Sequence, residues 1–377
     1  MTESPPTVRE APKPAIEREP SARTESRASY WAIAAFLFTA AVYLIWVQGA
    51  HLPLAGDFDS LGTIAAWITG VCTAAAFAVA FVIAVRHGRL GWRRELPIPK
   101  RIVDGVALTV AFAAVSALSV EAIANIFQRG FQGLTVDPLG GAALAGAAAA
   151  VFAYAGSLLG ARTTTVSIAM LATLVLFIGT MASMLTSPDD RWWELHFSQL
   201  GNQSGSGSAI AFNGALILTG LVIVAFADYA ARDAAHGLAL RRIDDGRFWS
   251  TRRRARTISW LLIAIGALMC VVGLVHDEVN TVVHVGAASG MVVVFGLLAV
   301  FTLSVAPELP RSFAALTAIV LAGIIASAVL WVPVGYLNLT GVEFVSAGLL
   351  FTWFVVYART ISAYALGPTV ETERSGR

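Results

Sequence analysis

Long apolar runs separated by short polar stretches dominate this chain from about residue 29 to residue 362. Most runs are near twenty residues, the length that an α-helix needs to cross a bilayer core of roughly 30 Å. Backbone groups in lipid must hydrogen-bond within their own segment, so each run is predicted to be a helix. The pattern predicts ten spans, at about residues 29–49, 60–85, 102–127, 138–160, 164–186, 208–230, 257–275, 279–304, 312–334 and 340–362.

The composition agrees with this pattern and excludes an ordinary soluble fold. The chain has 377 residues, of which 57% are hydrophobic and 13% charged, whereas soluble domains carry about 25% charged residues. The predicted fold class is therefore an all-α, polytopic integral membrane helix bundle of about ten transmembrane helices. Its two cysteines, Cys72 and Cys270, both lie in apolar runs, which favours buried hydrophobic roles over a disulfide or a metal motif.

Basic residues gather in alternate connections between the runs. The connection 86–101 holds six basic residues and the connection 231–256 holds eight, whereas 50–59, 128–137 and 187–207 hold few. Basic loops stay in the cytoplasm, which predicts that both termini are cytoplasmic as well. We expect the arginine clusters to contact anionic membrane lipid, and no nucleic acid. The oligomeric state is left open by the sequence.

The same pattern divides the chain into four segments. Residues 1–28 are rich in Pro, Glu, Arg and Ser without an apolar period, which predicts a disordered cytoplasmic tail. Residues 29–163 form an N-terminal four-helix membrane region, 164–362 form a six-helix membrane domain, and 363–377 form a second cytoplasmic tail. The longest connection is about 26 residues, so no soluble domain is expected between spans.

Most unusual polar residues fall on the predicted extracytoplasmic side. They cluster in the stretch 187–219 and at the outer ends of the later spans. Ionisable groups at membrane depth are costly and commonly mark a cavity, a pathway or a site. We therefore expect an outer cavity whose candidate residues are His196, Ser198, Asn213, His276, Asp277, His284, Glu343 and Glu121.

The chemistry of this cluster has several interpretations. Imidazoles and a carboxylate are the usual ligands of zinc, so His196, His276, His284 and Asp277 are a candidate zinc site. Histidines hydrogen-bonded at helix ends and a proton relay remain alternatives. Polar residues inside spans also bridge neighbouring helices. The sequence contains no P-loop, GxSxG, HExxH or dinucleotide-binding motif.

Several short motifs resemble one known family. They are Phe-Ser-Gln-Leu-Gly at 197–201, Phe-Asn at 212–213 with Gly220, Gly-Leu-Val-His-Asp at 273–277, His284 with Ala287, and Gly-Val-Glu-Phe at 341–344. Residues 164–362 thereby resemble the domain of unknown function 998 family, a group of mostly bacterial and archaeal polytopic membrane proteins. The chain departs from the family pattern where Val275 and His276 replace the usual Phe-Pro.

The resemblance implies a bacterial plasma-membrane protein and singles out Ser198, Asn213, His284 and Glu343, but it implies no activity. From the residues, we expect transport or lipid handling, without catalysis, through an extracytoplasmic-facing polar cavity. One alternative is a membrane-embedded, metal-dependent lipid hydrolase. It would resemble the alkaline-ceramidase-like hydrolases, which bind zinc with three histidines together with a serine and an aspartate. A structural or sensory membrane protein is the third interpretation. No cofactor is firmly implied, and zinc belongs to the hydrolase alternative.

Overall fold

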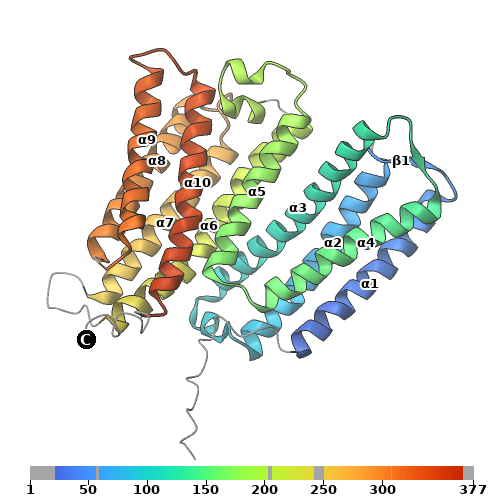
Figure 1. Cartoon of the computed structure of the whole chain (residues 1–377), viewed down its shortest axis with the longest axis horizontal. Helices are drawn as coiled ribbons and strands as arrows, with labels where there is room; N and C mark the ends of the chain where they lie inside the picture. The colour runs from blue at the N-terminus through green and yellow to red at the C-terminus, as the bar shows by residue number, and fades with distance from the viewer. Residues whose placement is uncertain (1–21, 57–58, 203–205, 242–249, 307, 368–377) are drawn as a thin grey trace, which may run out of the picture.

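A computed structural model describes residues 22–56, 59–202, 206–241, 250–306 and 308–367. Within them, ten long helices are apolar enough to cross a membrane, which confirms the predicted all-α bundle (Figure 1). They are α1 (Ala22–Val47), α2 (Leu61–His87), α3 (Ile98–Gly130), α4 (Pro138–Ala161), α5 (Thr165–Leu185), α6 (Gly207–Leu240), α7 (Thr251–Leu274), α8 (Thr281–Val305), α9 (Arg311–Trp331) and α10 (Leu339–Tyr364).

The first turn of α1 and the last turn of α10 lie at the same end of the bundle (Figure 1). An even number of spans requires this arrangement. We call this the basic end, because the α2–α3 connection and the first turn of α7, with their arginines, also lie there, and we call the opposite end the outer end. That the basic end faces the cytoplasm stays a prediction. Residues 1–21 and 368–377, which hold most of the two predicted tails, lie outside the described residues.

Among the described residues, six helices begin at a residue whose side chain accepts a hydrogen bond from the first turn. Such caps satisfy backbone N–H groups that have no partner within the helix. Where a cap is present, the predicted start agrees with the observed one within two residues. The caps are Ser60, Asp137, Thr164, Ser206, Asn280 and Asn338. At Asp137, hydrogen bonds from the backbone N–H of Gly140 and then of Leu139 lower the pKa of the carboxyl.

Helices α1, α3, α6 and α7 extend at least four residues beyond a predicted end, and α1 and α6 do so furthest. Helix α1 begins at Ala22 rather than at residue 29, because the Tyr154 hydroxyl of α4 donates to the Glu25 carboxylate at 2.6 Å and holds the first turns. Helix α6 ends at Leu240 rather than at residue 230, because its last turns stay buried and Gly237 contacts α10. In both cases tertiary contacts extend a helix past charged residues at which the apolar pattern stops.

The helices form two groups that are joined near the basic end. Helices α1–α4 pack mainly on one another, as do α5–α10, and α3 connects the groups through α5 and α6. The two groups diverge toward the outer end (Figure 1). There a cavity of about 870 Å³ lies between them, lined by α2, α3, α5 and α6.

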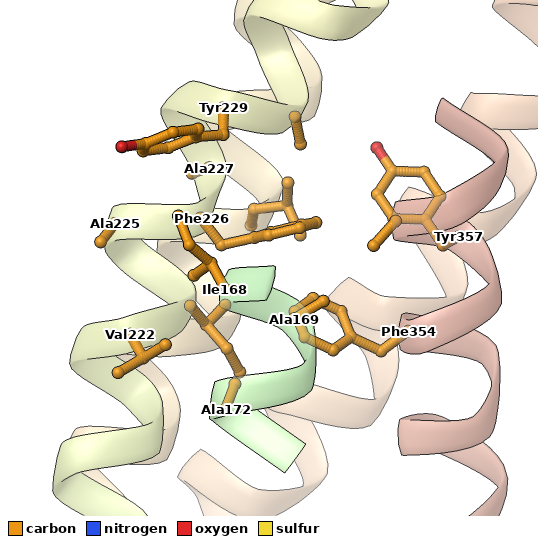
Figure 2. Packing of buried hydrophobic residues seen from close by; sticks show 14 of the residues in the cluster. Ile168, Ala169, Ala172, Val222, Ala225, Phe226, Ala227, Tyr229, Phe354 and Tyr357 are labelled. Carbon is orange, nitrogen blue, oxygen red and sulfur yellow. The ribbon is translucent and has the colours of Figure 1, made fainter. Parts of the chain in front are cut away.

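The core of the second group is built from small and aromatic side chains (Figure 2). Ile168 and Ala172 of α5 belong to the same buried cluster as Phe226 of α6, whose ring lies 4.7 Å from that of Phe354 of α10. Helices α6 and α7 lie so close together at Gly220 that a Cβ atom there would overlap the carbonyl oxygen of Gly266 on α7. Close packing of this kind replaces the hydrophobic effect as the force that joins helices in lipid.

Part of one basic connection is buried. The short 3₁₀ turn η1 (Gly91–Glu95) places the Arg93 guanidinium 2.8 Å from the Asp104 carboxylate of α3, and both side chains are 1% exposed. Lys100 of α3 reaches Asp228 of α6 at 2.9 Å. Arg93 therefore joins elements of the protein, and the expectation that this loop's arginines contact lipid does not hold for it.

The connections at the outer end contain a small sheet that the sequence pattern did not predict. Strands β1 (Leu52–Pro53) and β2 (Thr135–Val136) pair in antiparallel fashion. They fasten the α1–α2 connection to the α3–α4 connection. Two-residue strands carry too few alternating positions to be recognised in a sequence.

Candidate functional site

The connection between α5 and α6 covers the outer end of the second helix group. It forms two 3₁₀ turns, η2 (Trp192–Glu194) and η3 (Phe197–Gly201). The Phe197 ring packs between two others, with centroids 5.1 Å from Phe212 of α6 and 4.5 Å from Phe344 of α10. This aromatic contact seats the connection on the ends of α6 and α10.

Polar side chains from the same two helices hold the connection in place. Asn213 of α6 donates to the Gly201 carbonyl at 2.9 Å. Asn338, the cap of α10, donates to a carbonyl oxygen of η2 at 3.0 Å. The backbone N–H of Phe197 donates to the Glu343 carboxylate of α10. The conformation of η3 is therefore fixed from two sides.

The connection between α7 and α8 forms the facing wall. The Glu278 backbone N–H donates to the Asn202 side-chain oxygen at 3.4 Å, which links this wall to η3. His284, 6% exposed, places Nδ1 2.9 Å from the Val275 carbonyl oxygen. A carbonyl only accepts hydrogen bonds, so Nδ1 carries the proton. His284 thereby closes the C-terminal end of α7 and presents its other ring nitrogen to the site.

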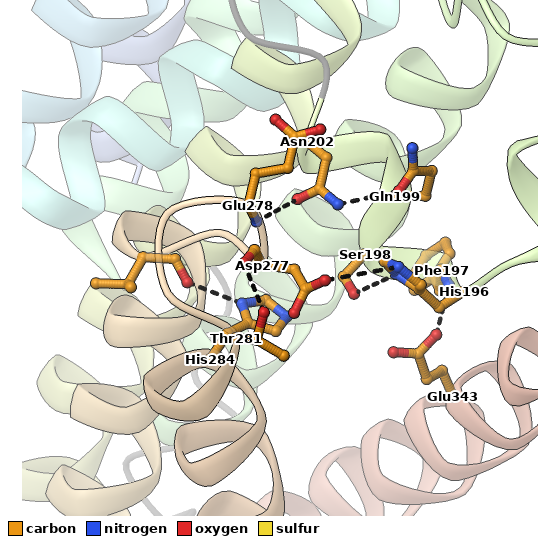
Figure 3. A network of polar contacts seen from close by, with 11 residues as sticks. His196, Phe197, Ser198, Gln199, Asn202, Asp277, Glu278, Thr281, His284 and Glu343 are labelled. Carbon is orange, nitrogen blue, oxygen red and sulfur yellow. Dashed lines mark hydrogen bonds and ion pairs between the residues drawn. The ribbon is translucent and has the colours of Figure 1, made fainter.

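The two walls bring a serine, a histidine and an aspartate together (Figure 3). His196 Nδ1 lies 2.9 Å from the Ser198 hydroxyl oxygen, and its Nε2 lies 3.8 Å from a carboxylate oxygen of Asp277. The side chains of His196 and Asp277 are 21% and 25% exposed. The group is thus half-buried and open to a ligand.

A cavity of about 680 Å³ lies directly beneath this group, within α5–α10. Its polar lining is concentrated at the loop end, and its walls along the helices are apolar. On α8 the lining runs from Thr281 to Leu298, which corresponds to about 25 Å at 1.5 Å per residue. The inner end is aromatic, where the Phe295 and Trp353 rings meet edge to face at 5.0 Å. The cavity is therefore a long apolar slot with one polar mouth.

The structure brings five of the eight candidate residues to this cavity. They are His196, Ser198, Asp277, His284 and Glu343. Asn213 instead holds η3, and His276 is half-buried beside Asp277 without lining the cavity.

Glu121 lies apart from the other candidates, on α3. Its carboxylate accepts a hydrogen bond from the Thr63 hydroxyl of α2 at 3.4 Å and one from the Asn125 side chain at 3.3 Å. Glu121 and Thr63 both line the second cavity, between the two helix groups. Glu121 is therefore no part of the slot, and it bridges α2 and α3.

The residues proposed for zinc do not fit a zinc centre as they are arranged. Among the described residues, no group of three or more His, Cys, Asp or Glu side chains could share a metal ion. Nδ1 of His284 faces a carbonyl oxygen, and Nδ1 of His196 faces a hydroxyl. A zinc site needs at least three ligand atoms that converge on one point.

Sequence reasoning missed the apolar lining and two polar positions, Asn202 and Thr281. Asn202 links the two walls, and the Thr281 hydroxyl donates to the Asp277 carbonyl at 3.1 Å. Thr281 begins α8 directly after its cap residue Asn280, so a search for helix caps would have drawn attention to it. Asn202 carries no comparable signal.

Ten apolar helices and a slot with one polar mouth define a multi-pass helical membrane protein. The family described as "Protein of unknown function (DUF998)" matches residues 170–360, and the chain belongs to this family. The match spans α5–α10, the domain that contains the slot, and agrees with the resemblance noted in the sequence. No curated protein and no solved structure matches the chain.

Proposed function

We propose that α5–α10 bind one membrane amphiphile, with its hydrocarbon chain in the slot and its polar end at the loop group. The observation that carries this proposal is the division of the lining, which is polar at the mouth and apolar along the helices. A volume of about 680 Å³ falls within the range of small-molecule sites. Lipid handling at the outer face is thus the function that the cavity supports best.

The packing of the helices supports entry from the bilayer. Helix α8 packs on α7 and α9 packs on α10, whereas α8 and α9 contact each other little. The slot lies between these two pairs and is lined by both. A hydrocarbon chain gains little free energy on moving from lipid into an apolar slot, so recognition depends on the polar end. The aromatic inner end favours binding over passage to the other face.

The charge of the mouth restricts the polar end of the amphiphile. Among the described residues that line the cavity, none is Lys or Arg, whereas Asp277 and Glu343 are both present. A phosphate would face two carboxylates without the cationic partners that such groups use. The amphiphile is therefore neutral or cationic at its polar end, and hydroxyl groups suit the available acceptors.

Two photoactivatable probes with the same acyl chain test this proposal. A diazirine-bearing monoacylglycerol should crosslink to peptides of α8 and α10 in the purified protein, and the corresponding lysophosphatidic acid should crosslink at least about tenfold less, a difference of about 1.4 kcal/mol. The variant A288W fills the slot and should abolish crosslinking. The control V293W changes an exposed position of the same helix that does not line the slot. Equal crosslinking in both variants, or by both probes, would contradict the proposal.

A further inference from the structure

We infer that Ser198, His196 and Asp277 catalyse acyl transfer on an ester bond of the bound amphiphile. This inference rests on the proposed lipid binding and adds a reaction to it. Ser198 is the nucleophile, His196 is the general base, and Asp277 holds the imidazole and stabilises its charged form. The substrate class is a neutral amphiphile whose acyl chain is esterified to an alcohol.

The geometry assigns each ring nitrogen of His196 a separate partner. Nδ1 lies 2.9 Å from the Ser198 hydroxyl, within hydrogen-bond distance. Nε2 faces the Asp277 carboxylate at 3.8 Å, the distance of an ion pair rather than of a hydrogen bond. The carboxylate favours a proton on Nε2, which leaves the Nδ1 lone pair free to accept the serine proton. Catalytic contacts of this kind commonly tighten only when substrate is bound.

The two nitrogens exchange the roles that they have in chymotrypsin-like triads. A triad is recognised by geometry and roles rather than by sequence position, and the chemistry needs only one accepting nitrogen and one donating nitrogen. Ser198 follows His196 by two residues, so no GxSxG motif is required to bring them together. Asp277 comes from another connection, and the Asn202–Glu278 hydrogen bond keeps that connection beside η3.

The group lies where an ester bond would be. In an acyl lipid, the ester joins the apolar chain to the polar end, and Ser198 and His196 line the cavity where the apolar slot meets its polar mouth. Phe197, between them, is held by Glu343. Glu343 is therefore a positioning residue, because it acts on the reacting side chains only through the backbone of η3.

The reaction needs no cofactor and no oxidant. The Ser198 oxygen attacks the ester carbonyl carbon while its proton passes to His196 Nδ1, and Asp277 stabilises the imidazolium that forms. The carbon–oxygen bond to the alcohol then breaks, and the alcohol leaves with the proton from His196. Ser198 now carries the acyl group as an ester. Water or a second alcohol attacks this ester by the same steps, which releases a fatty acid or a new ester and restores Ser198.

A fluorophosphonate probe tests the inference, since it forms a covalent bond only with activated serines. The full chain, purified in detergent, should gain the phosphonyl mass on the peptide that contains Ser198. Labelling should disappear in S198A and should slow by about 100-fold or more in H196A, the contribution typical of a general base. D277N should slow the labelling of Ser198 as well. The matched control S304A alters an exposed serine of α8 that lies outside the cavity and should label like the unchanged protein.

Mapping the adduct on the unchanged protein keeps the test valid if a variant fails to fold. Absence of an adduct on Ser198, or equal labelling of S198A, would overturn the inference. The monoacylglycerol crosslink separates this outcome from a failure of the proposed binding. If the monoacylglycerol crosslinks but Ser198 gains no adduct, the proposed reaction is wrong and the proposed binding stands. If neither the crosslink nor the adduct forms, the proposed amphiphile site is wrong as well.

Discussion

Glu343 on α10 accepts a hydrogen bond from the backbone N–H of Phe197, a residue 146 positions earlier in the chain. Phe197 lies between His196 and Ser198, so this one contact sets the position of both side chains. It also joins two of the motifs noted in the sequence, Phe197–Gly201 and Gly341–Phe344, which both lie within the residues matched by the family. Residues of these two motifs thus build the frame of the site.

Removing the Glu343 carboxylate should loosen this frame. In E343A the Phe197 N–H loses its acceptor, and we expect a stability loss of about 1.5–3 kcal/mol, as for hydrogen bonds to charged groups. Labelling of Ser198 should fall in parallel. E343Q keeps an oxygen that can accept the N–H and should restore most of both. Thermal unfolding in detergent and fluorophosphonate labelling measure the two effects, and equal labelling in E343A and the unchanged protein would contradict the positioning role.

His284 should act through its hydrogen bond to the Val275 carbonyl rather than as a metal ligand. H284A leaves that carbonyl without its donor in a partly buried position, which should cost about 1–3 kcal/mol. H284N offers an amide donor and should lose less. Metal analysis of the purified protein should give the same zinc content for H284A as for the unchanged chain. Stoichiometric zinc that disappears in H284A would instead support the zinc-hydrolase alternative.

Features that depend on a few neighbouring residues could be predicted from the sequence, whereas features that depend on tertiary packing could not. Helix starts with a capping side chain, such as Asn280 or Asn338, were predictable because the signal lies within a few residues. The end of α6 was not predictable, because contacts with α10, which is distant in sequence, hold its last turns. Likewise, His196 and Ser198 are neighbours in sequence, but the approach of Asp277 depends on how two connections pack together.

The Arg93–Asp104 pair should be a main contributor to the packing of the α2–α3 connection on α3 at the basic end. Both side chains are 1% exposed, and breaking a buried pair from one side leaves an uncompensated charge, at a cost of about 3–5 kcal/mol. D104A should therefore lower the unfolding temperature strongly. The exposed neighbour Arg94 provides the control R94A, which should change it little. If both variants unfold at the same temperature, the pair does not stabilise the packing of this connection.

The crossing of α6 and α7 should tolerate no side chain at Gly220. A Cβ atom there would overlap the Gly266 carbonyl, which is backbone and cannot move aside easily. We expect G220A to destabilise the protein by about 1–3 kcal/mol, as for other overpacked positions. G214A, on the same helix with open space around it, should be neutral or slightly stabilising because alanine favours helix. Thermal unfolding of the two variants side by side decides this, and equal stabilities would show that the helices separate easily.

The orientation of the bundle can be tested with single cysteines. Arg253 lies at the basic end and Asp190 at the outer end, and both are exposed. Because basic connections stay in the cytoplasm, R253C in intact cells should resist a thiol reagent that cannot cross the membrane, whereas D190C should react.

The native cysteines Cys72 and Cys270 lie within α2 and α7, so they are expected to contribute little background. Permeabilised cells provide the control, in which both positions should react. If R253C reacts and D190C is protected in intact cells, the bundle is inverted. The mouth of the slot would then open to the cytoplasm, and the amphiphile would be drawn from the inner leaflet.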